Sequence, residues 1–217
     1  MSDATQETIP PYERLKALVD PDAYKPGFLR RAMNTSAAVK TVSDAFPIVA
    51  LGYDLIAGDA TGLAFMLGLV VTPACSTTLG IASLSACAGR ISTDGAIQNA
   101  ESGTLKSCRS EFLKVAKNYL KTQTASTLLM ATFGMAFMGA VAESIGGADT
   151  LSPPSSRFAP EFYTFIACLS YAVGNYLGWK ANKYAEKLNV YEAAIKTVER
   201  KQKNQPPSAT VSPVQPT

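Results

Sequence analysis

Residues 61–89 read TGLAFMLGLVVTPACSTTLGIASLSACAG, a stretch without a single Asp, Glu, Lys or Arg. The next charge along the chain is Arg90. A helix needs about 20 predominantly apolar residues to cross the roughly 30 Å of hydrocarbon in a bilayer. The stretch therefore predicts a transmembrane helix. Pro73, near its middle, predicts a kink in that helix.

Two further charge-free runs have the length of a membrane span, residues 122–142 and residues 162–179. Aromatic side chains are enriched where transmembrane helices meet the membrane surface. The second run has such side chains towards both of its ends: Phe162, Tyr163, Tyr176 and Trp179. We expect both runs to cross the bilayer.

Residues 42–57 form a weaker apolar stretch that contains Asp44 and Asp54. It is short for a span, and hydropathy alone leaves its crossing undecided. Pro47 fits the first turn of a helix, where its missing N–H costs little. We therefore expect a helix to begin near this proline.

The distribution of the 20 Lys and Arg residues favours a fourth span. Six of them lie in residues 1–42, six in residues 90–121 and seven in residues 180–217, whereas residues 143–161 hold only Arg157. Positive residues concentrate on the cytoplasmic side of membrane proteins. The three basic segments share one side only if residues 42–57 also cross. Four spans then place both termini on the cytoplasmic, or matrix-like, side.

The fold class expected is all-α, a polytopic helical membrane protein with about four transmembrane helices and an extended aqueous C-terminal helix. Residues 1–41 are expected to be a polar N-terminal region. Its helix either lies on the membrane interface or is a solvated helix that leads to the first span. Residues 42–89 form a transmembrane hairpin, residues 90–121 a basic inside loop or helix, and residues 122–203 two more spans with a helical extension. The Pro-rich, uncharged residues 204–217 predict a disordered tail.

Within residues 90–121, apolar side chains recur at three- and four-residue spacing, which is typical of an amphipathic helix. They are Leu105, Cys108, Phe112, Ala116 and Tyr119.

Beyond the last span, an a/d seam about two heptads long continues the helix without a breaker. Its members are Tyr184, Leu188, Tyr191, Ile195 and Val198. Two heptads are too few to indicate a coiled coil. The seam therefore predicts packing against another helix, in this chain or in a partner.

Small residues four apart allow transmembrane helices to approach closely. The candidate packing positions are Gly174 with Gly178 and Ala64 with Gly68. In a chain rich in Ala, Gly and Ser, each motif alone is weak. Together they predict tight helix packing.

The chain contains no histidine, which excludes Ser-His and Cys-His catalysis and His-ligated zinc or haem. No phosphate-binding loop, nucleophile elbow or metal-ligand cluster occurs. The net charge of +3, without a basic block, gives no nucleic-acid signal. We therefore predict no catalytic, cofactor or metal site. Asp54 and Asp59 are a candidate ion site, with water reaching both near a turn as the alternative.

The function expected is a non-catalytic structural or assembly subunit of a membrane complex. Its partners would be the lipid bilayer and other membrane-protein subunits, or copies of itself. The alternative is a small channel or transporter for an ion or small solute. It would use the hydroxyl-rich second and third spans together with Asp54 or Asp59.

Overall fold

The structure is a computed structural model, which describes residue 16 and residues 25–58, 63–98, 103–146 and 160–204. These ranges form four long helices and contain no strand, so the all-α class is confirmed for them. The helices are α2 (Phe28–Ala57), α3 (Leu63–Gln98), α4 (Gly103–Gly146) and α5 (Pro160–Asn204).

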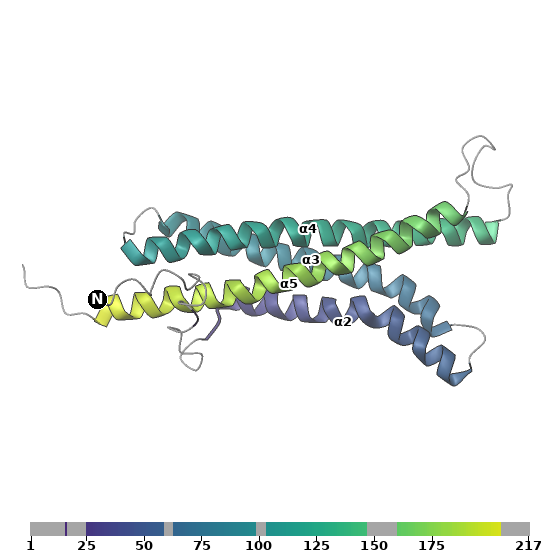
Figure 1. Cartoon of the computed structure of the whole chain (residues 1–217), viewed down its shortest axis with the longest axis horizontal. Coiled ribbons are helices and arrows are strands. Elements are labelled where there is room, and N and C mark those ends of the chain that lie inside the picture. The colour runs from purple at the N-terminus through teal and green to yellow at the C-terminus, as the bar shows by residue number, and fades with distance from the viewer. Residues whose placement is uncertain (1–15, 17–24, 59–62, 99–102, 147–159, 205–217) are drawn as a thin grey trace, which may run out of the picture.

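The four helices run lengthwise beside one another as two antiparallel hairpins, α2–α3 and α4–α5 (Figure 1). Helix α3 also packs on α4, whereas α2 and α5 touch the least of the neighbouring pairs. At one end of the molecule the α2–α3 hairpin diverges from α4 and α5 (Figure 1).

Helix α2 is a single helix from Phe28 to Ala57, with Pro47 in its interior. The expectation that a helix begins near Pro47 is therefore wrong. The residues before Pro47 are already helical, so the missing N–H of the proline removes one hydrogen bond within the helix. Figure 1 shows α2 curving along its length. The helix ends at Gly58, where φ of +68° suits glycine and the N–H donates to the Asp54 carbonyl.

Residues 90–121 are almost entirely helical rather than a loop, because α3 runs on to Gln98 and α4 begins at Gly103. The amphipathic pattern predicted in this segment is confirmed. All five of its apolar residues are buried: Leu105, Cys108, Phe112, Ala116 and Tyr119.

The bundle has two apolar cores. The larger core lies near the C-terminal end of α5 and includes Phe112, Leu188 and Ile195. The smaller core lies between α4 and α5, at the end where the α2–α3 hairpin diverges from them. It consists of Met130, Phe133, Ala136 and Ala167.

Large apolar side chains that are exposed on the bundle gather at one end of it. Apart from Phe28, Leu29 and Ile97, they all lie in residues 39–56 of α2, 66–81 of α3, 128–138 of α4 and 162–179 of α5. We call these four segments the apolar band.

Contacts between the helices place the four segments of the apolar band at the same level. Gly68 lies against Pro47, Gly134 against Pro73 and Gly139 against Tyr163. Two helical segments, Met66–Gln98 and Gly103–Val141, are long and apolar enough to cross a membrane.

Candidate functional site

The described helices bury charged side chains in three places, of which the third is Asp54 in the last turn of α2. The first is an interhelix ion-pair network beyond the apolar band, and all four helices contribute to it. The second is a Lys40–Asp44 pair on α2, inside the apolar band. The network consists of Arg30, Arg90, Asp94, Arg109, Glu192 and Glu199.

Glu192 on α5 joins the α2 and α3 sides of the network. Its Oε2 atom accepts a 2.8 Å hydrogen bond from Arg30 Nε. Its Oε1 atom lies 3.3 Å from Arg90 Nη2 and 3.8 Å from Lys196 Nζ. The carboxylate is 2% exposed, so these cations provide its charge compensation in place of water.

Arg109 on α4 completes the network. Its Nη1 atom donates a 2.5 Å hydrogen bond to Asp94 Oδ1, and its Nη2 atom donates one of the same length to Glu199 Oε1. Arg90 Nε lies 3.3 Å from Asp94 Oδ2 within α3. Three arginines and three carboxylates therefore pair within the network, and Lys196 adds a fourth cation beside Glu192.

The aromatic ring of Phe112 packs inside this network and is fully buried. The guanidinium carbons of Arg30 and Arg90 lie 5.7 Å and 5.9 Å from the ring centroid. At this distance a ring attracts a cation, and more strongly where water is excluded. Phe112 therefore orients two arginines as well as filling the core.

Burial raises the pKa of Asp94 above its usual value, and Arg90 and Arg109 act in the opposite direction. Removing these charges from water therefore costs free energy, and the pairing between them offsets this cost. Removing one member of a buried pair typically costs about 3–5 kcal/mol, because the partner is left as an uncompensated charge. The network therefore stabilises the packing of the helices against one another.

The Lys40–Asp44 pair lies one turn apart on the buried face of α2. Lys40 Nζ donates a 2.6 Å hydrogen bond to Asp44 Oδ2, and a longer one of 3.4 Å to Ser126 Oγ on α4. Ser126 in turn donates to the Gly174 carbonyl on α5. Both charged side chains are less than a tenth exposed. The pair therefore links α2 to the α4–α5 hairpin.

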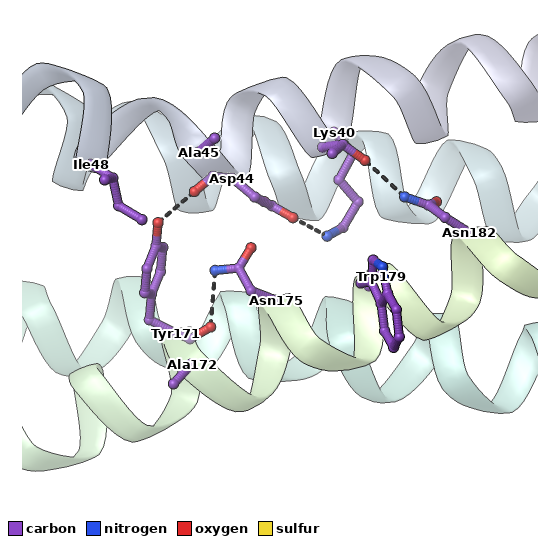
Figure 2. A pocket seen from close by; sticks show the side chains of 11 residues that line it. Lys40, Asp44, Ala45, Ile48, Tyr171, Ala172, Asn175, Trp179 and Asn182 are labelled. Atoms are coloured by element: carbon purple, nitrogen blue, oxygen red, sulfur yellow. Dashed lines mark hydrogen bonds and ion pairs between the residues drawn. The ribbon is translucent and has the colours of Figure 1, made fainter.

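A cavity of about 390 Å³ opens beside this pair, between α2 and α5. Figure 2 shows Lys40, Asp44 and Ala45 on one wall, with Tyr171, Asn175 and Asn182 opposite. We call this cavity the polar end of the α2–α5 groove.

Hydrogen bonds cross the polar end of the groove. The Tyr171 hydroxyl donates to the Asp44 carbonyl, and Asn182 Nδ2 donates to Thr41 Oγ1 across 2.8 Å. These bonds keep polar groups at the groove walls in fixed positions.

Of the two aspartates of the candidate ion site, the structure describes Asp54. Asp59 lies outside the described residues. Asp54 lies in the last turn of α2, and its side chain is buried rather than open to water as the alternative supposed. Asp44 and Asp54 are ten residues apart, which is roughly 15 Å along a helix. Asp44, the other buried aspartate of α2, therefore does not share a site with Asp54.

The candidate packing glycines lie at close helix contacts. A Cβ atom on Gly174 would lie 3.1 Å from Met130 Sδ, and one on Gly178 would lie 3.2 Å from Ser126 Oγ. A Cβ atom on Gly68 would lie 3.2 Å from Pro47 Cα. The side chain of Ala64 lies outside the described residues.

The a/d seam of α5 packs within this chain. Leu188, Tyr191 and Ile195 are buried in the larger core, and Tyr184 and Val198 pack against it. The sequence left open whether the seam packs on a helix of this chain or of a partner. In the structure it packs on helices of this chain. The expected helical extension of the last span is present as the C-terminal part of α5.

The sequence did not single out the buried charges. Arg30 and Lys40 lie in residues 1–41, for which the sequence predicts an interfacial or solvated helix, but both are buried. One signal was available: the buried positions of α2, among them Arg30, Met33, Ala37, Lys40, Asp44 and Pro47, follow a three-four spacing. A charged residue that falls on such a spacing indicates a pair inside a bundle.

Comparison with known proteins adds no relative: no family model matches the chain, and no curated protein or solved structure is significantly similar to it.

Proposed function

We propose that all four helices cross a membrane through the apolar band. Each of its segments in α2 and α5 spans 18 residues, which is about 27 Å of helix and close to the hydrocarbon thickness. The only charges within the four segments are Lys40, Asp44 and Asp54. All three are buried inside the bundle. This arrangement, apolar outside and charged inside, is typical of a bundle surrounded by lipid.

The orientation proposed follows from the basic residues beyond the band. Arg90 and Lys180 are the first charges after the α3 and α5 segments of the band, and Lys121 is the last charge before the α4 segment. All three lie on the side of the band on which the ion-pair network lies, because Arg90 belongs to it and Arg109 and Glu192 follow the same helices outward. By the positive-inside rule this end faces the cytoplasm or a matrix-like compartment. Both chain termini are then expected on that side.

The function proposed is a non-catalytic structural subunit, in which a rigid helical stalk on the basic side is held to the membrane by four spans. The ion-pair network is the observation that carries this proposal. Its charges pair with one another across all four helices, so they hold the stalk together instead of serving a reaction. Partners are expected to be other membrane subunits or further copies of this chain.

Mild detergent extraction from the native membrane tests this proposal through the mass and composition of the complex that contains the chain. We expect a larger assembly with other chains, or copies, in fixed ratio. Glu192→Gln should weaken that assembly, whereas Glu186→Gln, at an exposed position of the same helix, should leave it intact. A lone monomer from the native membrane would contradict the subunit role.

A small channel or transporter remains the second candidate, favoured by buried polar side chains within the apolar band. They are Lys40, Asp44, Asp54, Thr72, Ser76 and Ser170. Vesicles loaded with a fluorescent cation indicator test it. Flux that Asp54→Asn abolishes, while the variant still assembles, would favour transport over the structural role.

A further inference from the structure

We propose that the α2–α5 groove binds a neutral membrane lipid, with an uncharged hydroxyl head group at the polar end and an acyl chain along an apolar end. This inference goes beyond the structural role, and it relies only on the apolar band lying in the membrane. The argument rests on the continuity of the groove, its polarity and the state of its charges.

The groove has an apolar end that continues from the polar end. A second cavity of about 340 Å³ lies between α2 and the α4–α5 hairpin. Ile48 and Tyr171 line both cavities, so the two adjoin along the same side of the bundle. Apart from Thr164 and the Tyr171 hydroxyl, the second cavity is walled by apolar side chains, among them Leu51, Phe133 and Phe137.

The polar and apolar ends of the groove are arranged along the band in the same order as the head group and acyl chain of a membrane lipid. Its polar end lies beside Gly178 and Trp179, immediately before Lys180, which is the first charge beyond the α5 segment of the band. Its apolar end reaches Ala167 and Thr164, about four turns further along α5, so the groove runs through the interior of the band towards its opposite edge. A lipid in this groove would hold its head group near the membrane surface and its chain in the hydrocarbon.

The charges of the polar end favour a head group without charge. Lys40 Nζ is already bonded to Asp44 Oδ2, so the pair offers no net charge to a ligand. A phosphate here would meet the Asp44 carboxylate as well as the lysine, and the repulsion would offset the attraction. Among the described residues, Lys40 is the one basic side chain that lines this cavity, and the nearby Lys183 Nζ lies over the Trp179 ring, 4.0 Å from its centroid.

Hydrogen-bonding groups at the polar end fit a hydroxyl. Figure 2 shows the side-chain oxygen of Asn175 pointing across the groove towards α2, while its Nδ2 atom donates to the Tyr171 carbonyl. Asp44 Oδ1 accepts no hydrogen bond from the described residues. Both oxygens are acceptors, so a head group that donates a hydrogen bond suits them.

A flexible lipid chain fits the groove better than a rigid helix does, because the wall of the groove bends. Helix α2 curves away from α5 along the band (Figure 1), and Pro47 lines the apolar cavity. A flexible acyl chain follows such a curved wall. A diacylglycerol has both the hydroxyl head and the acyl chain, and it is the lipid to which we commit.

Photolabelling of the full chain in phosphatidylcholine vesicles tests this proposal. The probe is a diacylglycerol with a diazirine in one acyl chain, and the matched comparator is the phosphatidic acid with the same chains. Mass spectrometry maps the labelled peptides. We expect diacylglycerol to label the peptides that contain Leu51, Phe133 and Phe137 at least five-fold more than phosphatidic acid does.

A filling variant separates the groove from the general lipid surface. Ala172 lines the groove, and Ala172→Phe should block it and reduce diacylglycerol labelling at least five-fold. Val173→Phe, at the next exposed position, should leave labelling unchanged. Unchanged labelling in Ala172→Phe would overturn the proposal. Stronger labelling of wild type by phosphatidic acid would also overturn it, and that comparison needs no folded variant.

Discussion

The two ends of the bundle have opposite organisation. Beyond the apolar band, Phe112 and Leu188 fill the interior, and Lys114, Lys117 and Glu186 are among the exposed side chains. Within the band, the exposed side chains are apolar and the buried ones include Lys40, Asp44 and Asp54. The same four helices thus expose polar side chains at one end of the bundle and apolar side chains at the other.

Breaking the ion-pair network should produce the largest effect, because the stalk depends on it. Glu192→Gln removes the carboxylate shared by Arg30, Arg90 and Lys196, and we expect a loss of about 3–5 kcal/mol in the free energy of unfolding. Unfolding of the purified protein in mild detergent measures it. Glu186→Gln should change stability by less than about 0.5 kcal/mol. Equal effects of the two variants would mean that the network does not hold the helices.

A lysine placed on the exposed surface distinguishes the two ends directly. Val49 and Ile97 are both exposed apolar residues, one inside the apolar band and one outside it. Val49→Lys should cost about 2.5–3.5 kcal/mol in membrane insertion, because it places a charge in hydrocarbon, whereas Ile97→Lys should cost almost nothing. A glycosylation-based insertion assay measures the difference. Similar values for both variants would place Val49 in water.

Overpacking a helix contact within the band should have a smaller effect. Gly174→Leu pushes a side chain into Met130, and we expect a loss of about 1–3 kcal/mol in stability. Gly95 lies in α3 with no atom within 4 Å of its missing Cβ, so Gly95→Ala should stabilise the helix by up to about 1 kcal/mol. Thermal unfolding in detergent compares the two. A tolerated Gly174→Leu would show that α4 and α5 are not tightly packed there.

The smallest effect concerns the pH dependence of the network. Burial raises the pKa of Asp94 above 3.8, so between 3.8 and the raised value the folded protein binds more protons at this site than the unfolded chain. The contribution of Asp94 to stability therefore increases as the pH falls through this window and is lost as the pH rises. Measured against Asp94→Asn, wild type should gain stability on acidification from neutral pH. A constant difference would contradict the raised pKa.

Much of the fold could be predicted from the sequence because helical periodicity is a local signal. The spacing of Leu105, Phe112 and Tyr119 identified a buried face, and that of Leu188 and Ile195 identified another. The boundaries were harder to predict, since nothing local separates the predicted interfacial helix from α2. Pro47 suggested a helix start but lies inside a helix that tolerates it.

The ion pairs between helices could not be predicted because their partners lie far away along the chain. Arg30 pairs with Glu192, which is 162 residues away, and Arg109 pairs with Glu199, 90 residues away. Each charge alone resembles an ordinary surface residue. The α2–α5 groove is likewise a product of how two distant helices diverge. Only the three-dimensional arrangement brings Asp44 and Asn175 to one cavity.

The reactivity of the natural cysteines tests the central claim that the apolar band lies in a membrane. Cys75 and Cys168 are exposed on the band, so in water a soluble maleimide would modify both, whereas in hydrocarbon the soluble reagent does not reach them. Ser107→Cys, exposed beyond the band, is the positive control in opened native vesicles. We predict rapid modification at position 107 and none at Cys75 or Cys168 until detergent denaturation. Equally rapid modification of Cys75 and Cys168 in intact membranes would contradict the account.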